Sequence, residues 1–249
     1  MSELGRPREL SRPIPTFVHQ RNRLTAGQQR AWDRWWPQLG HEVDELVAGT
    51  DAFDPPAWFG RRAPLVLEIG SGMGESTAAM AAAAPDVDHL AVEVFEPGLA
   101  QLLMRITEAG LRNVVPIRGD AVALLRERVP PAALDGIRIY FPDPWPKRRH
   151  HKRRLVQPSF VTLAACRLRR GGTLHVATDW PDYAEQTRRI CDAEPLLDNI
   201  AGQEPGGWAE RPPWRPVTKF EQRARSEGRD VRDLLYLRNI AEQPSDHSM

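Results

Sequence analysis

The stretch from Tyr140 to Leu155, YFPDPWPKRRHHKRRL, combines a carboxylate, an indole ring and a dense positive charge. Prolines flank both Asp143 and Trp145, which limits the backbone freedom around these two residues. A carboxylate can accept hydrogen bonds from a nucleobase edge, an indole can stack on the base, and basic side chains can neutralise phosphates. The stretch therefore predicts a site that acts on a base within a polyanion. The charge run alone would equally allow a solvated basic loop after an edge strand.

The positive charge of the chain is concentrated in this stretch. Residues 147–154 hold six Lys or Arg and two His with no acid, whereas the net charge of all 249 residues is +1. The remaining residues therefore carry 1 − 6 = −5, and such a concentrated patch is typical of a surface that steers a polyanion. We expect His150 and His151 to act as donors near phosphates rather than as metal ligands, because no third ligand lies at a suitable spacing.

A second segment, LVLEIGSGMGE at residues 65–75, joins an apolar run to a glycine-rich turn. Its three glycines are Gly70, Gly72 and Gly74. They let the backbone turn sharply and let a ligand approach without meeting a Cβ atom. Where a dinucleotide-binding turn has its third glycine, this chain has Glu75, whose charge disfavours a pyrophosphate. An adenosyl amino acid carries an ammonium and a sulfonium instead, so a carboxylate such as Glu68 favours it.

Two further acids follow apolar runs. Glu93 ends the second run, 25 residues after Glu68, where a carboxylate can accept hydrogen bonds from both ribose hydroxyls. Asp120 follows the third run and could receive the adenine amino group, although it could equally be the N-cap of the next helix. Together with the glycine-rich turn, these acids predict S-adenosyl-L-methionine as the cofactor.

These residues can meet only if parallel strands bring them to one edge of a sheet. From residue 64 onward, short apolar runs alternate with helix-compatible segments, which is typical of a parallel sheet flanked by helices. The expected strands are Leu65–Ile69, Leu90–Val94, Val114–Ile117, Gly136–Phe141, Thr173–Thr178 and Val231–Leu237. The expected helices are Glu75–Ala84, Pro97–Ala109, Ala121–Arg128, Val156–Leu168, Tyr183–Ala193 and Lys219–Ser226. The pattern indicates an α/β, Rossmann-like class I methyltransferase fold: a seven-stranded, mostly parallel sheet with helices on both faces, plus an N-terminal extension.

The chain divides into four expected segments. Residues 1–24 form a flexible Arg/Pro-rich arm, 25–62 a helical N-terminal extension, 63–240 the methyltransferase domain and 241–249 a disordered tail. The extension holds three tryptophans at one-turn spacing: Trp32, Trp35 and Trp36. We expect them to pack onto the main domain, with base stacking as the alternative.

Composition excludes several classes of protein. Hydrophobic residues make up 41% of the chain and charged residues 27%, as in an ordinary globular protein. Cys166 and Cys191 lie 25 residues apart, which is no metal-ligand spacing, and two cysteines indicate a reducing compartment. No apolar stretch reaches the length of about 18 residues that a membrane span needs, and the start MSELGRPREL lacks an apolar signal region. We expect a cytoplasmic protein with no membrane and no metal partner.

Taken together, these motifs resemble one family, the bacterial tRNA (guanine-N7-)-methyltransferases. The resemblance runs from about Leu65 to Arg238 and rests on LEIGSGMGES, AVEVFEPG, the Asp120-Ala121 pair, YFPDPWPKRRHHKRRL, ATDWPDYAE and TKFEQRARSEGRDVRDLLY. The PDPWPK string together with TKFE is its most specific part. The family implies methyl transfer from S-adenosyl-L-methionine to N7 of a guanosine in the tRNA variable loop, position 46 in tRNA numbering, to give 7-methylguanosine.

The resemblance also implies roles for individual residues, with tRNA as the partner. Cofactor-binding residues are Glu68, Gly70, Gly72, Gly74, Glu93, Asp120 and Asp143, and Asp143 is also the catalytic position. Substrate contacts fall on Lys147, Asp179, Thr218, Lys219, Phe220 and Glu221. RNA contacts fall on Arg149, His150, His151, Lys152, Arg153 and Arg154. The oligomeric state stays open between monomer and homodimer.

Two of these assignments have simpler alternatives. Asp179 could cap the helix that begins near Pro181, and residues 218–221 could be only a helix start. The resemblance favours binding roles for both. The chain departs from the family at Ala224, where a glycine is frequent; alanine should be tolerated unless that backbone has a positive φ.

Three other functions share parts of the pattern. A class I methyltransferase acting on another base, such as an adenine N6 amino group, uses a related proline-rich motif, but the amino group loses a proton on methylation whereas guanine N7 does not. A nucleotide-dependent dehydrogenase is disfavoured by Glu75. A non-catalytic RNA-binding relative is disfavoured by the acids at four strand ends, which a decayed pocket has no reason to retain.

Overall fold

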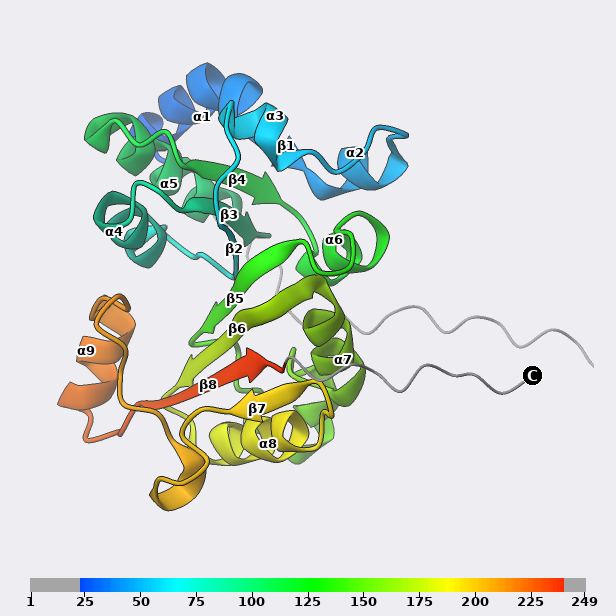
Figure 1. The fold of residues 1–249 in the computed structure, drawn as a ribbon. Helices are drawn as coiled ribbons and strands as arrows, with labels where there is room; N and C mark the ends of the chain where they lie inside the picture. Colours follow the sequence, from blue (N-terminus) through cyan, green and yellow to red (C-terminus); the bar gives the residue numbers. More distant parts are fainter. Residues whose placement is uncertain (1–22, 240–249) are drawn as a thin grey trace, which may run out of the picture.

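The computed structural model describes residues 23–239, drawn as a ribbon in Figure 1. The predicted tail at 241–249 lies outside the described residues, and so does the predicted arm at 1–24 except for its last two residues.

One eight-stranded sheet with the order β1-β4-β3-β2-β5-β6-β8-β7 forms the centre of the fold (Figure 1). Its strands are β1 (His41–Glu42), β2 (Leu65–Ile69), β3 (Asp88–Glu93), β4 (Val114–Arg118), β5 (Leu134–Tyr140), β6 (Leu168–Thr178), β7 (Leu197–Asn199) and β8 (Arg232–Arg238). The strands from β1 to β6 pair in parallel, and β8 pairs antiparallel with both β6 and β7. The sequence predicts a seven-stranded sheet and locates six of its strands, whereas the structure has eight. The two strands that the sequence does not locate, β1 and β7, are edge strands with too few residues for a periodic apolar signal.

The strand order contains a reversal that marks a binding position. The chain moves outward from β2 to β3 and β4, and then returns to place β5 on the other side of β2. Loops at the carboxyl ends of β2 and β5 therefore leave the sheet in opposite directions. In open α/β sheets, ligands bind at such a switch point.

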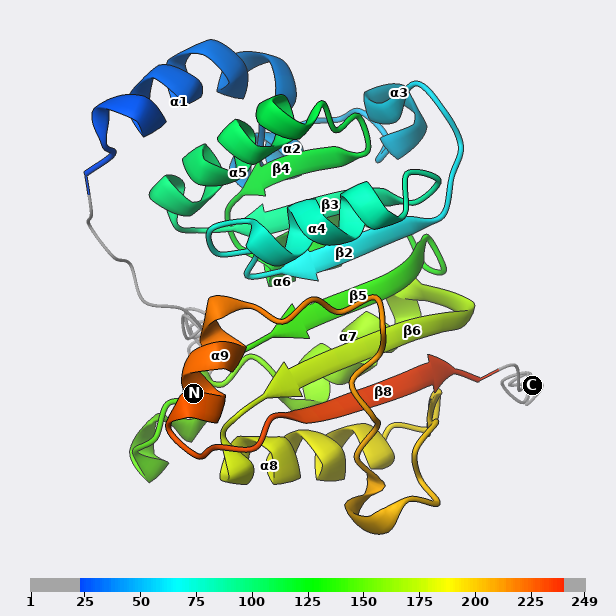
Figure 2. The same cartoon turned by 90° about the vertical axis from the view of Figure 1, so that its left-hand side faces the viewer.

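Helices cover both faces of the sheet. They are α1 (Ala26–Leu39), α2 (Val43–Ala48), α3 (Pro55–Phe59), α4 (Glu75–Ala83), α5 (Glu96–Ala109), α6 (Ala121–Glu127), α7 (Pro158–Arg167), α8 (Pro181–Asp192) and α9 (Lys219–Ser226), with short 3-10 turns η1 (Arg148–Arg153) and η2 (Pro205–Gly207). Helices α1, α4 and α5 pack in one layer, and α2, α6, α7 and α8 in the other (Figures 1 and 2). The expected architecture is confirmed.

Local signals explain where these helices begin and end. Thr25 and Gln28 form a capping box at the start of α1, and a proline stands in the first turn of α5, α7 and α8. Gly110 ends α5 in the left-handed conformation with a φ of 63°. The predicted bounds of β2 and α9 agree with the structure residue for residue, and the Thr218 side chain caps α9.

The N-terminal extension packs on the main domain and adds a strand to its sheet. Helix α1 lies against α5, where the Gln28 side chain donates to the Pro97 carbonyl at 3.1 Å, and β1 pairs with β4. The rings of Trp32 and Trp36 stack at 4.1 Å, with the Arg118 guanidinium 5.2 and 5.9 Å from their centroids. The packing interpretation of these two tryptophans is therefore confirmed.

An irregular segment covers part of the sheet. Residues 200–218 join β7 to α9 and cross in front of β8 and β6 in Figure 2. Trp214 from this segment lies edge-on to His175 of β6, with ring centroids 6.5 Å apart. The helix α9 that follows stands near the carboxyl ends of β5 and β6 (Figure 2).

Candidate active site

Five predicted acids lie on or just after neighbouring parallel strands. Glu68 belongs to β2, Glu93 ends β3, and Asp120, Asp143 and Asp179 follow the last residues of β4, β5 and β6. Because the carboxyl ends of parallel strands meet at one edge, the fold brings these acids to the same side of the sheet, around the switch point between β2 and β5.

The loop between β2 and α4 presents open backbone. Gly70, Gly72 and Gly74 have φ values of 79°, 54° and 70°, and a Cβ atom at either of the first two would meet nothing within 4 Å. Helix α5 supports this loop closely, since a Cβ at Gly98 would lie 2.2 Å from the Gly72 carbonyl oxygen. The buried Ser71 hydroxyl has no hydrogen-bond partner among the described residues. These features fit a cofactor held mainly by backbone groups.

Glu93 and Asp120 are oriented by backbone hydrogen bonds. Glu93 Oε2 accepts from the Gly72 N–H at 2.9 Å, and Oε1 accepts from the next two residues at 2.7 and 2.9 Å. Asp120 Oδ1 accepts from the Val122 N–H at 2.8 Å and caps α6. The capping alternative for Asp120 therefore holds. Its contact with adenine stays a prediction, and the same bond fixes the carboxylate at the edge where Glu93 lies.

Glu68 lies beneath the glycine-rich loop rather than on its surface. Its carboxyl is only 2% exposed and accepts from the Thr77 hydroxyl at 2.6 Å, which ties α4 to β2. Burial raises the pKa of Glu68 to about 7. Because Glu68 is buried, a direct contact between its carboxylate and a cofactor does not fit the described geometry. Its position does fit a negative charge that lies beneath a bound cation, such as the ammonium or sulfonium of the cofactor.

Replacing Glu68 with glutamine should change the pH dependence of stability. The carboxyl takes up its proton at about pH 7 in the folded chain but only near 4.5 when unfolded, so the free energy of unfolding of the wild type falls as pH rises through that window. The free energy of unfolding of Glu68→Gln, measured relative to that of the wild type, should therefore be about 3 kcal/mol higher at pH 8 than at pH 4. Urea unfolding of both proteins at the two pH values measures this, and an unchanged difference would contradict it.

The loop that carries Asp143 has a strained backbone. Phe141 and Trp145 have φ values of 51° and 45°, which bulky side chains rarely adopt. The Phe141 N–H still donates to the Ala177 carbonyl at 2.8 Å, so the loop departs from a point fixed to β6. The Asp143 side chain is accessible at the surface, while the surrounding loop desolvates the carboxylate enough to raise its pKa. Such strain is frequent where a fold holds one side chain in a set direction.

The basic run forms the turn η1 and packs around Trp145. The Arg153 guanidinium lies 4.9 Å from the Trp145 ring centroid, and the His150 ring meets the same indole edge-on at 5.8 Å. Four cationic residues of this run are exposed: Lys147, Arg148, Arg149 and Lys152. We call these four residues the cationic surface.

Arg154 does not belong to that surface. It is 0% exposed, and its guanidinium donates to Asp182 Oδ2 at 2.6 Å and to the Pro144 carbonyl at 2.8 Å. The predicted RNA contact of Arg154 therefore does not fit the structure. Arg154 instead links Pro144, the residue after Asp143, to Asp182 of α8. Its position in a run of charged residues does not predict this role.

Asp179 accepts a hydrogen bond from Arg229 Nε at 2.8 Å. Helix α8 has no side-chain cap, so the alternative in which Asp179 caps that helix is wrong. Arg229 lies between α9 and β8, and the sequence motifs alone did not single it out.

The segment from Thr218 to Glu221 begins α9. The Thr218 hydroxyl accepts from the Glu221 N–H at 3.4 Å, so the simpler helix-start interpretation is correct as local geometry. Phe220 is 65% exposed, and its ring lies 6.3 Å from that of Phe141 with an angle of 22° between the planes. Two aromatic rings from distant parts of the chain thus lie side by side next to the Asp143 loop.

Glu221 points the other way. It is 0% exposed and is paired with Arg215 and Arg225. Its predicted contact with substrate therefore does not fit the described geometry. Ala224 is buried within α9 and has no positive φ, which explains why alanine is accommodated there.

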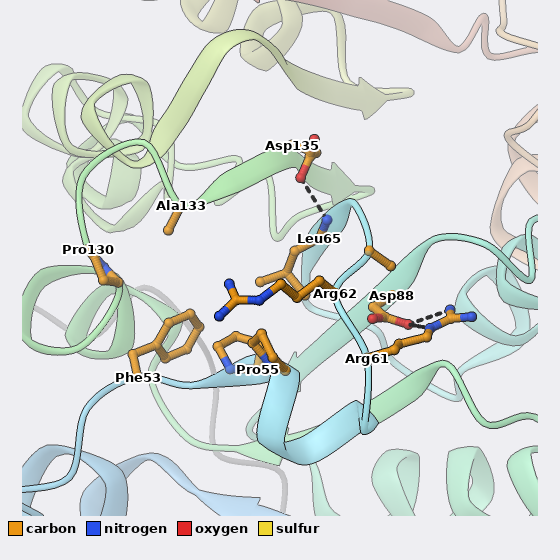
Figure 3. Close-up of a pocket in the computed structure, with 11 residues that line it drawn as sticks. Phe53, Pro55, Arg61, Arg62, Leu65, Asp88, Pro130, Ala133 and Asp135 are labelled. Atoms are coloured by element: carbon orange, nitrogen blue, oxygen red, sulfur yellow. Dashed lines mark hydrogen bonds and ion pairs between the residues drawn. The ribbon is translucent and has the colours of Figure 1, made fainter.

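A cavity of about 230 Å³ lies at the opposite, amino-terminal edge of the sheet (Figure 3). Arg61 donates to Asp88 Oδ1 at 3.0 and 2.6 Å beside it, and Asp135 accepts from the Leu65 N–H at 2.8 Å. It holds none of the predicted site residues. Among residues 23–239, no helix is long and apolar enough to cross a bilayer, and no three His, Cys, Asp or Glu side chains gather as a metal site.

The doubly wound sheet, the glycine-rich loop after β2 and the acid at the end of β3 define a class I methyltransferase. Residues 62–234 match the family model Methyltransf_4, described as "Putative methyltransferase". The chain is 51% identical to a tRNA (guanine-N(7)-)-methyltransferase of Streptomyces avermitilis, covering 91% of this chain and 76% of that protein. It is 46% identical to one of Alcanivorax borkumensis, covering 92% of each chain, and 49% identical to one of Nocardia farcinica, covering 90% and 83%.

The alignment with the Alcanivorax borkumensis protein covers 92% of this chain, which is more than the residues 62–234 that match the family model. The similarity therefore includes the N-terminal extension as well as the sheet. This chain belongs to the tRNA (guanine-N(7)-)-methyltransferase family.

Proposed function

We propose that this protein transfers a methyl group from S-adenosyl-L-methionine to N7 of a guanosine in tRNA, at position 46 of the variable loop. One observation carries the proposal: Asp143 follows β5, directly beside the strand whose glycine-rich loop suits an adenosyl cofactor, and it precedes the cationic surface. One flank of Asp143 therefore suits a methyl donor, and the other suits a nucleic acid.

The chemistry of guanine N7 limits what the protein must do. N7 carries a free lone pair near neutral pH; its bond to the methyl carbon forms as the sulfur–carbon bond breaks, leaving a neutral thioether and a cationic guanine. No proton is removed, so no general base is required. The protein contributes in-line positioning, worth roughly 7–11 kcal/mol in favourable cases, and negative charge beside the developing cation.

Asp143 is the proposed source of that charge. It would accept hydrogen bonds from the guanine N–H donors and hold the base in line with the methyl group. Phe141 is better placed than Trp145 to border the ring, because Phe141 faces Phe220 whereas Trp145 packs against Arg153. The two phenyl rings would limit how the base can tilt.

The remaining site residues divide between cofactor and RNA. Backbone groups of residues 70–74 would line the cofactor, Glu93 would accept from the ribose hydroxyls, and Asp120 would receive the adenine amino group. Lys147, Arg149, Lys152 and the neighbouring His150, His151 and Arg153 would contact phosphates. Asp179, Thr218 and Lys219 would form the rim near the base.

Methylation of tRNA that lacks 7-methylguanosine, with labelled S-adenosyl-L-methionine and nucleoside analysis, tests this function. Label should appear in 7-methylguanosine, and tRNA already carrying that modification should accept none. Label in another nucleoside would keep the class of enzyme but overturn the substrate. Cofactor binding without transfer to tRNA would contradict the proposed activity.

A further inference from the structure

Beneath the rim of the site lies a chain of five buried polar side chains, whose pairing with one another the sequence motifs do not predict. Tyr140 ends β5, His175 lies in β6 and Asp233 in β8, while Arg215 and Glu221 come from the segment that leads into α9 and from α9 itself. Each of these side chains is at least nine-tenths buried. Such groups are costly to bury unless all are paired.

The chain is continuous from β5 to α9. The Tyr140 hydroxyl lies 2.9 Å from His175 Nδ1, and His175 Nε2 lies 2.7 Å from Asp233 Oδ1. A neutral imidazole satisfies both contacts if Nε2–H donates to the carboxylate and Nδ1 accepts from the hydroxyl. Burial lowers the pKa of His175, which agrees with the neutral form.

Arg215 joins this strand-borne part to the helix. Its Nε and Nη2 donate to the two oxygens of Asp233 at 2.7 and 2.8 Å, and its Nη1 donates to Glu221. The same guanidinium lies 5.9 and 6.0 Å from the ring centroids of Tyr140 and Phe141. The planar fork of arginine can bind two carboxylates in fixed directions at once, which a lysine ammonium cannot do.

Helix α9 has few other means of attachment. It is eight residues long, and only Glu221 and Ala224 are buried. Within the described part of the chain, no helix or strand packs extensively against it. The buried contacts of this helix are therefore those of the Ala224 methyl group and of Glu221, which pairs with Arg215 and lies 3.9 Å from Arg211 Nε. Since Phe220 directly precedes Glu221, the Arg215–Glu221 contact lies next to the residue that stacks on Phe141.

We propose that Arg215 is a positioning residue, which sets the separation between the Asp143 loop and the start of α9. The inference rests on the proposed function for its kinetic consequence but not for its structural one. Arg215 touches neither the glycine-rich loop nor the acids at the ends of β3 and β4. Its loss should therefore affect the RNA side of the site and leave the cofactor side unchanged.

Arg215→Lys tests this, with Arg61→Lys as the matched control, because Arg61 also donates through its fork to a buried aspartate but at the opposite edge of the sheet. In Arg215→Lys, kcat/KM for tRNA should fall at least tenfold while the Kd for S-adenosyl-L-methionine changes less than twofold. Hydrogen exchange should accelerate at residues 219–226 and stay unchanged at residues 65–77. Arg61→Lys should show none of these changes.

Wild-type kinetics together with unchanged exchange at α9 would overturn the inference, and so would an equal loss of cofactor and tRNA affinity. If Arg215→Lys does not fold, Asp233→Asn can replace it, because asparagine keeps the shape and one acceptor oxygen of aspartate. In this variant too, kcat/KM for tRNA should fall while the Kd for S-adenosyl-L-methionine stays nearly unchanged. An equal loss of tRNA and cofactor affinity would refute the inference. A wild-type protein inactive on tRNA would end the proposed function, while the exchange at α9 would still decide the role of Arg215.

Discussion

Asp143→Asn should lower the rate of methyl transfer by about 100-fold or more, the effect typical of removing one preorganised electrostatic group from a transition state. The substitution keeps the shape of the side chain and one acceptor oxygen, but it removes the negative charge and replaces the other oxygen with a donor NH2 group. Because the guanine ring becomes cationic as the bond to N7 forms, the loss should appear in the chemical step. Single-turnover methylation of tRNA at saturating cofactor measures that step directly.

Cofactor binding should respond much less. Asp143 follows β5, whereas the glycine-rich loop and Glu93 belong to β2 and β3 and are held by their own hydrogen bonds. Asp198→Asn, the same change at an exposed position on β7, is the matched control and should have no effect. Equal single-turnover rates for Asp143→Asn and wild type would show that the carboxylate has no part in catalysis.

The pH profile gives a second readout of the same residue. Desolvation raises the pKa of Asp143 above its ordinary value near 3.8, so the active carboxylate is lost as pH falls through that raised pKa. The wild-type rate should therefore decline on the acid side of the profile. Asp143→Asn should lack this decline, because its side chain does not titrate.

The sequence could predict the edge of the sheet where the site lies. Apolar runs such as 65–69 are buried in full in the strand, and turn signals bound them, so the strand ends and the acids that follow them could be placed in advance. Family motifs then assigned roles to residues that local geometry alone would treat as caps, such as Thr218. Both kinds of information are local in sequence.

What could not be predicted depends on contacts between distant residues. Arg154 and Arg149 stand in one charge run, yet only the fold shows that Arg154 is buried against Asp182. The motif suggests that Glu221 lies at the rim of the site, but Glu221 is buried and pairs with Arg215, which also donates to Asp233. Arg215 carries no signal of its own, because its partners come from β8 and α9 and only the folded chain brings them together.

The cationic surface should govern how tRNA binding depends on salt. We consider the variant Arg148→Ala, Arg149→Ala, Lys152→Ala, which removes three exposed charges after β5 and keeps Trp145 and the buried Arg154 in the sequence. If each cation neutralises one phosphate, the slope of log Kd against log salt should fall by about 2–3, which corresponds to an affinity loss on the order of 100-fold near physiological salt. Fluorescence anisotropy of labelled tRNA over a range of salt concentrations measures both quantities.

A matched variant separates position from total charge. Arg62→Ala, Arg112→Ala, Arg170→Ala also removes three exposed arginines, but these lie near the amino-terminal ends of β2, β4 and β6. If RNA were attracted by positive charge anywhere on the surface, the slope would fall equally in both variants. A bound tRNA that crosses the carboxyl edge of the sheet should instead lower it only in the first, because counterions are released where phosphates meet cations. The two slopes therefore determine which edge of the sheet faces the RNA, without any measurement of catalysis.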